Sequence, residues 1–344
     1  MSHVKQVSLN GRSYQVARGF NMYIDITSAC NGACSFCIAP TVGRKDGGRF
    51  FEGAAFALDL AEQVGGSVQI VGGEPSISRR LPALLNMVGE HTIRRTVLNT
   101  NGTALTDRKI EQMKTAGVRY VNISRHHFDE RRNQGIMRLR PMLSNAGLAS
   151  AVDRITRAGI GVRMQCNLIK GEVDSVQKMT KYTDWCASIG CNTISFSQVF
   201  PLNAFGHQVP LEPGYTEQVQ IDLRALVTEM DAGDTFVPAA ENRFREEGMS
   251  AWGGGHIVSA KIGGKRRFWT GPSGTFVSLK TLSGYDEHDL PRPTVYRKED
   301  DWELRDGLLA FAVVHPDGRV TASWDSAERV LFDPQQVVVR TIAA

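Results

Sequence analysis

Three cysteines, Cys30, Cys34 and Cys37, lie in one short stretch with the spacing C-x3-C-x2-C. Three thiolates at this spacing can hold three irons of a cubane iron–sulfur cluster and leave the fourth iron without a protein ligand. A closed zinc or iron–sulfur site normally takes four protein ligands, and this stretch contains no further Cys or His. It therefore predicts an open iron–sulfur site at which a small molecule can bind. A structural zinc clip or three unrelated buried thiols are the alternatives.

A second motif, Gly72-Gly-Glu-Pro75, follows an apolar run at residues 68–71. Gly72 and Gly73 remove side chains where backbone must approach a ligand closely, and Pro75 fixes the turn. Glu74 is suitably placed to accept hydrogen bonds from an amino group. Taken alone, the motif is equally compatible with an ordinary turn between a strand and a helix.

The elements that must position these motifs alternate between strands and helices. Apolar runs predict strands at 22–27, 68–71, 95–99, 119–124, 162–169 and 193–200, and helical spacing predicts helices at 51–64, 81–88, 106–116, 146–158 and 175–189. Six β/α units argue for a parallel sheet with helices outside it. We therefore expect an α/β protein, a partial (β/α)6 TIM barrel, with the cysteines just past a strand's carboxyl end, where such barrels keep their chemistry.

The flanking regions have different patterns. Residues 4–17 alternate in polarity around Asn10-Gly11, which predicts a β-hairpin. Beyond 203 we expect a helix at 215–230, strands at 256–260, 276–279 and 308–314, and a turn at Pro316–Gly318. The expected organisation is an N-terminal hairpin at 1–19, the barrel at 20–203, and a C-terminal α+β extension at 204–344 that covers the barrel and contributes to substrate binding.

Composition excludes several classes of protein. The 344 residues are 42% hydrophobic, enough to bury a large core. The net charge is +4, from 40 basic and 36 acidic residues without a long Lys/Arg tract, which argues neither for nor against nucleic-acid binding. We expect no nucleic-acid partner. There is no signal sequence and no apolar run of membrane length, so we expect a cytoplasmic protein without a membrane partner. Six cysteines, three of them in one open loop, fit a reducing compartment.

Together, Cys30, Cys34, Cys37 and the Gly72–Pro75 motif on this β/α pattern resemble the radical S-adenosylmethionine (radical SAM) superfamily over roughly residues 20–200. The resemblance implies that the three cysteines bind one 4Fe-4S cluster and that S-adenosyl-L-methionine binds at its open iron. It also implies an external electron donor such as flavodoxin or ferredoxin. The expected reaction is reductive cleavage of this cofactor to methionine and a 5′-deoxyadenosyl radical, which abstracts hydrogen from a substrate.

The single cluster and modest length resemble the small-molecule-modifying branch of the superfamily. The expected substrate is a small polar, carboxylate-bearing metabolite, such as a sugar nucleoside, sugar or amino acid of specialised metabolism, including natural product biosynthesis. Decarboxylation, dehydration and epimerisation all remain open, so the enzyme could be a lyase, an isomerase or an oxidoreductase.

The resemblance also suggests residues around the cofactor. The polar stretch at 124–133 is expected to form a loop at the barrel mouth. His126 and His127 in it are candidates for proton donation or substrate contact, and solvent-facing polarity is the alternative. Expected cofactor contacts are Phe36, Gly72, Gly73, Glu74, Pro75, Asn99, Asn101, Ser124, Arg138, Asn167, Gln198 and Phe200.

Two other functions are compatible with the sequence. The first is a peptide-modifying maturase that lacks auxiliary clusters: residues 205–344 contain no Cys, and Ser323 lies near where such an extension would carry one. The second is a non-catalytic iron–sulfur sensor, which would have no use for the Gly72–Pro75 motif. The remaining cysteines, Cys166, Cys186 and Cys191, are predicted to be structural because no spacing among them resembles an auxiliary cluster.

Overall fold

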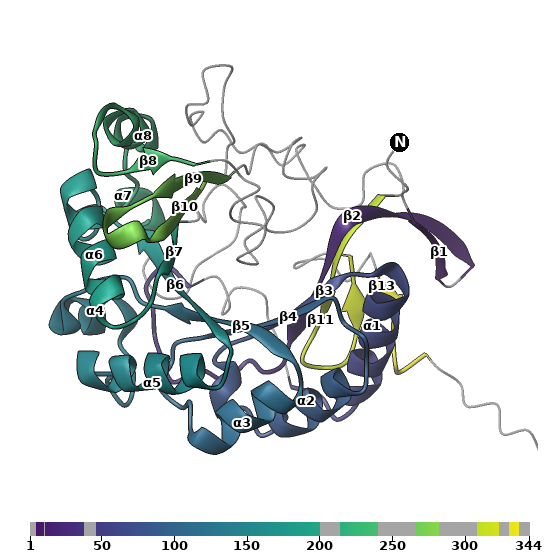
Figure 1. Ribbon diagram of the computed structural model, residues 1–344. Coiled ribbons are helices and arrows are strands. Elements are labelled where there is room, and N and C mark those ends of the chain that lie inside the picture. Colours follow the sequence, from purple (N-terminus) through teal and green to yellow (C-terminus); the bar gives the residue numbers. More distant parts are fainter. Residues whose placement is uncertain are drawn as a thin grey trace, which may run out of the picture.

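One mostly parallel sheet with helices on its convex side organises the protein (Figure 1). The computed structural model describes residues 5–9, 11–37, 46–199, 214–239, 266–281, 308–322 and 330–336. The strand expected at 256–260 and Ser323 lie outside these residues. The α/β fold and the open, partial barrel predicted from the sequence are confirmed.

The strands in the described part of the chain follow one spatial order, β13-β12-β11-β2-β3-β4-β5-β6-β7-β10-β9-β8, with β1 beside β2. Their bounds are β1 Lys5–Leu9, β2 Arg12–Asp25, β3 Ser67–Val71, β4 Arg95–Thr100, β5 Val118–Ser124, β6 Gly161–Leu168, β7 Thr193–Gln198, β8 Val237–Pro238, β9 Arg266–Thr270, β10 Phe276–Lys280, β11 Leu308–Val314, β12 Val320–Thr321 and β13 Val330–Phe332. Strands β2 to β7 pair in chain order and in parallel, as the repeated β/α units predict.

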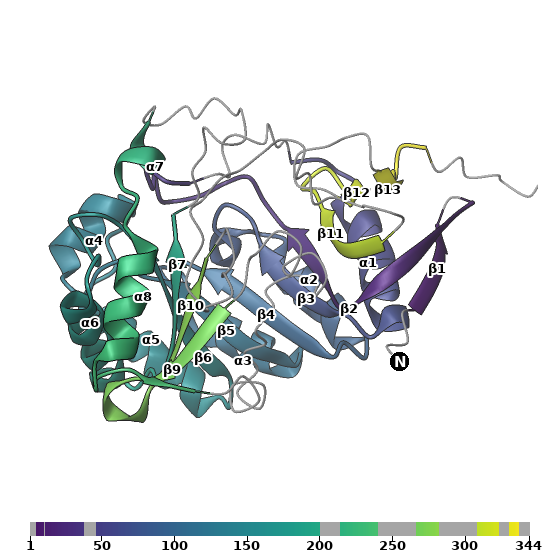
Figure 2. The same cartoon turned by 90° about the horizontal axis from the view of Figure 1, so that it is seen from above.

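Strands from the C-terminal region extend this parallel row at both edges. β11 pairs in parallel with β2, and β10 pairs in parallel with β7, so they lie at opposite ends of the row (Figure 2). The added strands satisfy the backbone groups that an edge strand would otherwise leave unpaired. The region expected as a separate extension therefore contributes to the same sheet as the barrel.

Most of the helices cover the apolar, convex face of the sheet. Their bounds are α1 Phe50–Val64, α2 Leu81–Gly89, α3 Asp107–Thr115, α4 Glu130–Met137, α5 Asn145–Arg157, α6 Val176–Ser188, α7 Tyr215–Gln218 and α8 Leu223–Ala232, with short 3-10 turns at η2 Pro75–Ile77 and η4 Pro272–Gly274. Val68 and Ile70 of β3 are fully buried in the core that the helices share with the sheet. Because side chains alternate along a strand, the intervening Gln69 lies on the concave face.

The predicted helices begin and end where their capping residues indicate. Thr106, Ser144 and Ser175 each accept a hydrogen bond from the amide three residues ahead, at the starts of α3, α5 and α6. Gly65 ends α1 in the left-handed conformation that only glycine adopts at little cost. No helix in the described ranges has the length and apolar composition that a membrane crossing requires.

Three elements differ from the sequence prediction. The polar stretch at 124–133 was expected to be a loop, but α4 begins within it because Asp129 accepts a hydrogen bond of 2.9 Å from the amide of Arg132. The helix expected at 215–230 is divided into α7 and α8, because Asp222 caps a new start through the amide of Ala225 at 3.0 Å. The hairpin boundary expected after residue 19 falls inside β2, so the hairpin and the barrel share a strand.

Candidate functional site

The cysteine loop, residues 26–37, follows β2 and lies against the segment that ends α4. The amide of Ala33 donates to the carbonyl oxygen of Met137 at 3.0 Å, and the amide of Arg140 donates to the carbonyl oxygen of Asn31 at 2.8 Å. Cys34 Sγ lies 3.6 Å from the same Met137 oxygen. This segment, far away in the sequence, therefore fixes the backbone between the cysteines.

The three thiols of the loop lie within electrostatic reach of one another. Burial, together with smaller contributions from the neighbouring Cys37 and Cys30, raises the pKa of Cys34 to about 12, and Arg138 opposes the shift. Cys30 is exposed, and Cys34 and Cys37 are half-buried. Iron binding would displace the protons and neutralise the clustered thiolates, so this donor set fits an iron–sulfur cluster.

No three His, Cys, Asp or Glu side chains in the described ranges converge on a single metal ion. This finding is compatible with a cubane cluster, because each thiolate binds a different iron. All ligands of one zinc ion would instead have to lie within about 2.3 Å of it.

The turn at Gly72 and Gly73 packs directly on the backbone of the cysteine loop. The amide of Gly73 donates to the carbonyl oxygen of Thr27 at 2.8 Å. A Cβ atom on Gly73 would lie 2.2 Å from the carbonyl oxygen of Ala29, and one on Gly72 would lie 2.8 Å from that of Thr27. The glycines predicted to allow approach to a ligand therefore also allow the two motifs to meet.

Glu74 joins this turn to the end of β4. Its side chain is 1% exposed, and Oε1 accepts hydrogen bonds from the amide of Ser76 at 2.8 Å and the hydroxyl of Thr100 at 2.5 Å. Oε2 accepts from the amide of Asn101 at 2.6 Å. The side-chain amide of Asn101 in turn donates to Asn31 Oδ1 at 2.8 Å, next to the first cysteine. The predicted cofactor contacts Glu74 and Asn101 thus belong to one network with the cysteine loop.

Pro75 occupies the first position of the η2 turn, for which Glu74 is the N-terminal cap. Proline is well suited to this position because its backbone angle is already fixed and its missing N–H would have no partner there. The turn therefore orients the Glu74 carboxylate toward β4.

His126 contacts both Phe36 of the cysteine loop and Asn167 of β6. The rings of Phe36 and His126 meet edge to face, with centroids 4.8 Å apart. His126 Nδ1 accepts a hydrogen bond of 2.9 Å from the amide of Asn167, and His127 Nδ1 accepts one of 2.8 Å from the amide of Asp129. Both histidines are buried, so a catalytic role for either stays a prediction.

Burial also determines the charge of these histidines. Desolvation, with a smaller contribution from Arg125, lowers the pKa of His126 to about 3. Burial lowers the pKa of His127 as well, although Glu172, whose Oε2 lies 3.8 Å from Nε2, opposes the shift. His126 is therefore neutral at physiological pH, with Nδ1 as a hydrogen-bond acceptor.

Two further predicted contacts lie at the ends of elements. Arg138 ends α4 in the left-handed conformation, with φ 49° and ψ 46°, which is uncommon for a residue with a side chain. This places its charge near Cys34, as the pKa of that thiol indicates. Ser124 is the last residue of β5 and pairs with Gln165 of β6.

Asn99 belongs to a row of amide side chains on the concave face of the sheet. Its Oδ1 accepts from Asn122 Nδ2 at 2.9 Å, and its Nδ2 lies 3.4 Å from Gln69 Oε1. Asn122 is 3% exposed, and its Oδ1 has no partner in the described ranges. Sequence reasoning missed Gln69 and Asn122, although each lies between two apolar residues of its strand, a pattern that indicates the opposite face from those neighbours.

Gln198, another predicted contact, is not brought to this face. Asn167 pairs with Ser197, and Leu168 pairs with Gln198, so Gln198 lies on the opposite face of the sheet from Asn167. Gln198 Nε2 donates to Gln220 Oε1 at 2.9 Å. Phe200 lies outside the described residues.

The cysteines outside the loop are packed into the core. Cys166, Cys186 and Cys191 are each at most 1% exposed, and burial raises the pKa of each thiol. Cys166 Sγ lies 3.6 Å from the carbonyl oxygen of His126, and Cys191 Sγ lies 3.7 Å from that of Val162. Their surroundings agree with a structural role.

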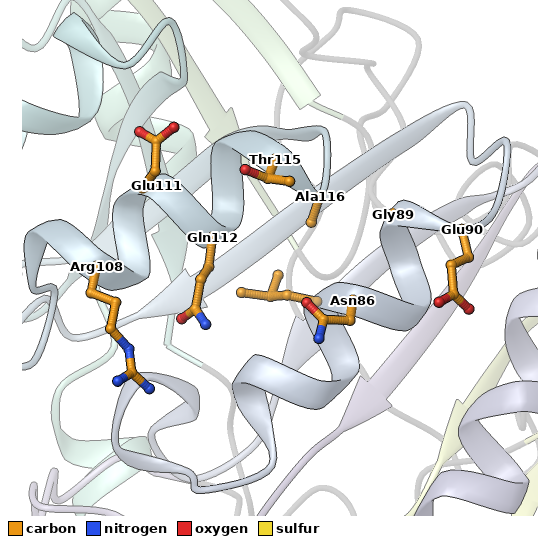
Figure 3. A pocket seen from close by; sticks show the side chains of 9 residues that line it. Asn86, Gly89, Glu90, Arg108, Glu111, Gln112, Thr115 and Ala116 are labelled. Carbon is orange, nitrogen blue, oxygen red and sulfur yellow. The ribbon is translucent and has the colours of Figure 1, made fainter.

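A groove of about 600 Å³ lies between α2 and α3 on the helical layer (Figure 3). Its lining includes Asn86 and Glu90 from α2 and its end, and Arg108 and Gln112 from α3. It contains no residue of the cysteine loop or of the Gly72–Pro75 motif. The groove is therefore separate from the candidate site.

Comparison with known proteins identifies related sequences. Residues 24–183 match the Radical SAM superfamily. The chain is 34% identical over 116 residues to a GTP 3′,8-cyclase of Tolumonas auensis, covering 32% of this chain and 34% of that protein. It is 29% identical over 126 residues to a GTP 3′,8-cyclase of Yersinia pestis, covering 34% of this chain and 37% of that one. The chain thus spans about a third of the length of these curated relatives.

Two solved structures share the fold over most of the chain. SuiB of Streptococcus suis bound to the precursor peptide SuiA superposes with a TM-score of 0.55 at 15% identity, covering 89% of this chain and 60% of that one. The protein anSMEcpe with bound AdoMet superposes with a TM-score of 0.53 at 13% identity, covering 93% and 79%. At these identities the likeness shows a common fold.

Proposed function

Since residues 24–183 place this chain in the radical SAM superfamily, we propose that it is an enzyme that cleaves S-adenosyl-L-methionine reductively at a 4Fe-4S cluster held by Cys30, Cys34 and Cys37. One observation carries the proposal: the Gly72–Pro75 motif is hydrogen-bonded to the backbone that precedes Cys30. The amide of Gly73 reaches Thr27, and the amide of Glu74 reaches Ala29, each at 2.8 Å. A cluster ligand set and a cofactor-binding turn would therefore form one unit.

When bound, the cluster and S-adenosyl-L-methionine supply one-electron cleavage and a radical that removes hydrogen from an unactivated carbon. This chain's residues position the reactants. Glu74 holds the turn against β4 through its three hydrogen bonds. Phe36 and His126 pack together beside the third cysteine, and such apolar packing helps to exclude water from the site.

We propose a small polar, carboxylate-bearing metabolite as the substrate, in specialised metabolism. The amide row of Gln69, Asn99 and Asn122 supports a polar ligand on the concave face, because amides both donate and accept hydrogen bonds. Decarboxylation, dehydration and epimerisation are the candidate outcomes. The electron would come from a flavodoxin or ferredoxin in the cytoplasm.

The test is to reconstitute the protein with iron and sulfide without oxygen, reduce it, and measure 5′-deoxyadenosine and methionine by mass spectrometry. We expect both products from the wild type and neither from Cys34→Ala. Cys191→Ala is the matched control, because it removes a buried thiol outside the loop. A wild-type protein that assembles the cluster without cleaving the cofactor would contradict the proposal and favour the sensor.

The substrate class is tested with deuterated compounds. We expect deuterium to move from a carboxylate-bearing sugar nucleoside, sugar or amino acid into 5′-deoxyadenosine. GTP is included because the curated relatives are GTP 3′,8-cyclases, although the aligned third of those proteins supports shared chemistry rather than a shared substrate. A peptide as the only deuterium donor would favour the maturase instead.

A further inference from the structure

Arg80, just past the Gly72–Pro75 motif, donates hydrogen bonds to three separate segments of the chain. Its Nη1 reaches the carbonyl oxygen of Ile26 at 3.1 Å and that of Pro316 at 2.9 Å. Its Nη2 reaches the carbonyl oxygen of Gly47 at 2.6 Å. Ile26 precedes the three cysteines and Gly47 follows them, so one guanidinium group joins the chain on both sides of the ligands to the β11–β12 turn.

Asp46, next to Gly47, also binds the chain just before the three cysteines. Its carboxylate accepts hydrogen bonds from the amide of Ser28 at 3.1 Å and the hydroxyl of Thr27 at 3.2 Å. The Arg80 guanidinium lies 4.0 Å from Asp46, and it also lies over the ring of Phe50, 4.7 Å from the centroid. The positive charge of Arg80 is thus held between a carboxylate, an aromatic face and carbonyl oxygens.

The β11–β12 turn docks closely on the start of α1. The amide of Gly47 donates to the carbonyl oxygen of Pro316 at 3.0 Å. A Cβ atom on Gly53 would lie 1.9 Å from the carbonyl oxygen of Gly318, and one on Gly318, where φ is +96°, would lie 2.4 Å from that of Arg49. Only glycine at these positions lets the two backbones approach so closely. The contact between the β11–β12 turn and α1 therefore depends on both glycines.

We propose that Arg80 is a positioning residue that clamps both sides of the cysteine loop to this C-terminal turn and thereby retains the cluster. The proposal rests on the proposed function, because it takes the three cysteines as cluster ligands. Arg80 holds Ile26 and Gly47, one on each side of the three cysteines, in place before iron binds. This reduces the conformational entropy that the chain carrying the cysteines must lose when the cluster binds. Arginine is required because its rigid fork serves several carbonyl oxygens at once, whereas a lysine ammonium is a single point charge.

The test compares Arg80→Met with Arg79→Met, which removes the same charge from an exposed neighbouring position. After reconstitution, the cluster is challenged with an iron chelator and its loss is followed by absorbance and by the EPR signal of the reduced protein. We expect loss at least about tenfold faster in Arg80→Met, the smallest factor that corresponds to losing one hydrogen bond to a charged group. Arg79→Met should lose the cluster at the wild-type rate. Arg80→Lys should lose it as fast as Arg80→Met.

Hydrogen exchange in the cluster-free proteins gives an independent readout. The Gly47 amide, which bonds to Pro316, should exchange about tenfold faster in Arg80→Met while the amides of β4 stay protected. Equal cluster loss and equal exchange in Arg80→Met and the wild type would overturn the clamp. A wild type that binds no cluster would instead overturn the proposed function, and exchange at Gly47 would still decide the clamp.

Discussion

The amide nitrogen of Glu74 donates a hydrogen bond of 2.8 Å to the carbonyl oxygen of Ala29. This bond joins the two motifs of the sequence at the residue before Cys30. Whatever displaces the turn at Gly72–Pro75 must therefore also displace the cysteine loop. Changes in either motif should have consequences for both cluster and cofactor.

Gly73→Ala should weaken cluster binding and destabilise the protein. The added methyl group would lie 2.2 Å from the carbonyl oxygen of Ala29, so the cysteine loop must move away. We expect a loss of about 1–3 kcal/mol in the free energy of unfolding of the cluster-free protein. Urea unfolding and the iron content after reconstitution measure the two effects.

Gly135→Ala is the control for this substitution. A Cβ atom there meets nothing within 4 Å, and the residue lies inside α4. Alanine should therefore leave the iron content unchanged and stabilise the helix by up to about 1 kcal/mol. Equal iron content in Gly73→Ala and Gly135→Ala would contradict the contact between the motifs.

Glu74→Ala should spare the cluster thiols but weaken binding of S-adenosyl-L-methionine. It also leaves the buried amides of Ser76 and Asn101 without their acceptor, which should cost about 1–3 kcal/mol for each unsatisfied group. Calorimetric titration with the cofactor and urea unfolding separate the two losses. Thr100→Val, which removes one hydrogen bond to Glu74, is the comparison. Unchanged cofactor affinity in Glu74→Ala would show that Glu74 does not belong to the cofactor site.

Protonation of His126 should destabilise the protein at mildly acidic pH. Burial lowers its pKa to about 3 in the folded state, below the ordinary value of 6.5, so the unfolded chain binds the extra proton between these values. Stability from this residue is complete above pH 6.5 and is lost as the pH falls toward 3. At pH 5 the loss should be about 2 kcal/mol, and His126→Gln should remove that part of the pH dependence in urea unfolding.

His91 supplies a control of opposite sign. Burial lowers its pKa, but hydrogen bonds with Met87 and Asp59 raise it overall, so protonation favours the folded state. His91→Gln should therefore remove stability at pH 5 relative to pH 8. A His126→Gln protein with the same pH slope as the wild type would show that His126 is not buried and neutral.

Alkylation should distinguish the two groups of cysteines. Thiols of the cysteine loop are exposed or half-buried, whereas Cys166, Cys186 and Cys191 are buried in the core and out of reach of a reagent in solution. Iodoacetamide should label Cys30 first under native, cluster-free conditions and the buried three only after unfolding. Early labelling of Cys166, measured by peptide mass spectrometry, would contradict the core packing.

The sequence by itself predicted an open cluster site and the alternation of elements. The cysteine spacing is local, so the prediction of an open cluster site needed no fold. The apolar runs located β2 to β7 because most consecutive residues of these parallel strands are buried, which gives runs of apolar residues. It did not reveal α4, because the helix is short and polar and its start depends on one capping contact by Asp129.

Only the tertiary structure decided which distant residues support the cysteine loop. Met137, Asn101 and Arg80 reach it from different β/α units. Pro316, far along the chain, accepts hydrogen bonds from Arg80 and from Gly47, which follows the cysteines. Such contacts depend on the order of the strands in the sheet and on glycines that let two backbones come close together. Neither of these produces a periodic pattern in the sequence. The sequence placed the cysteines and the glycine-rich turn in neighbouring units, and the fold decided that their backbones bond to each other.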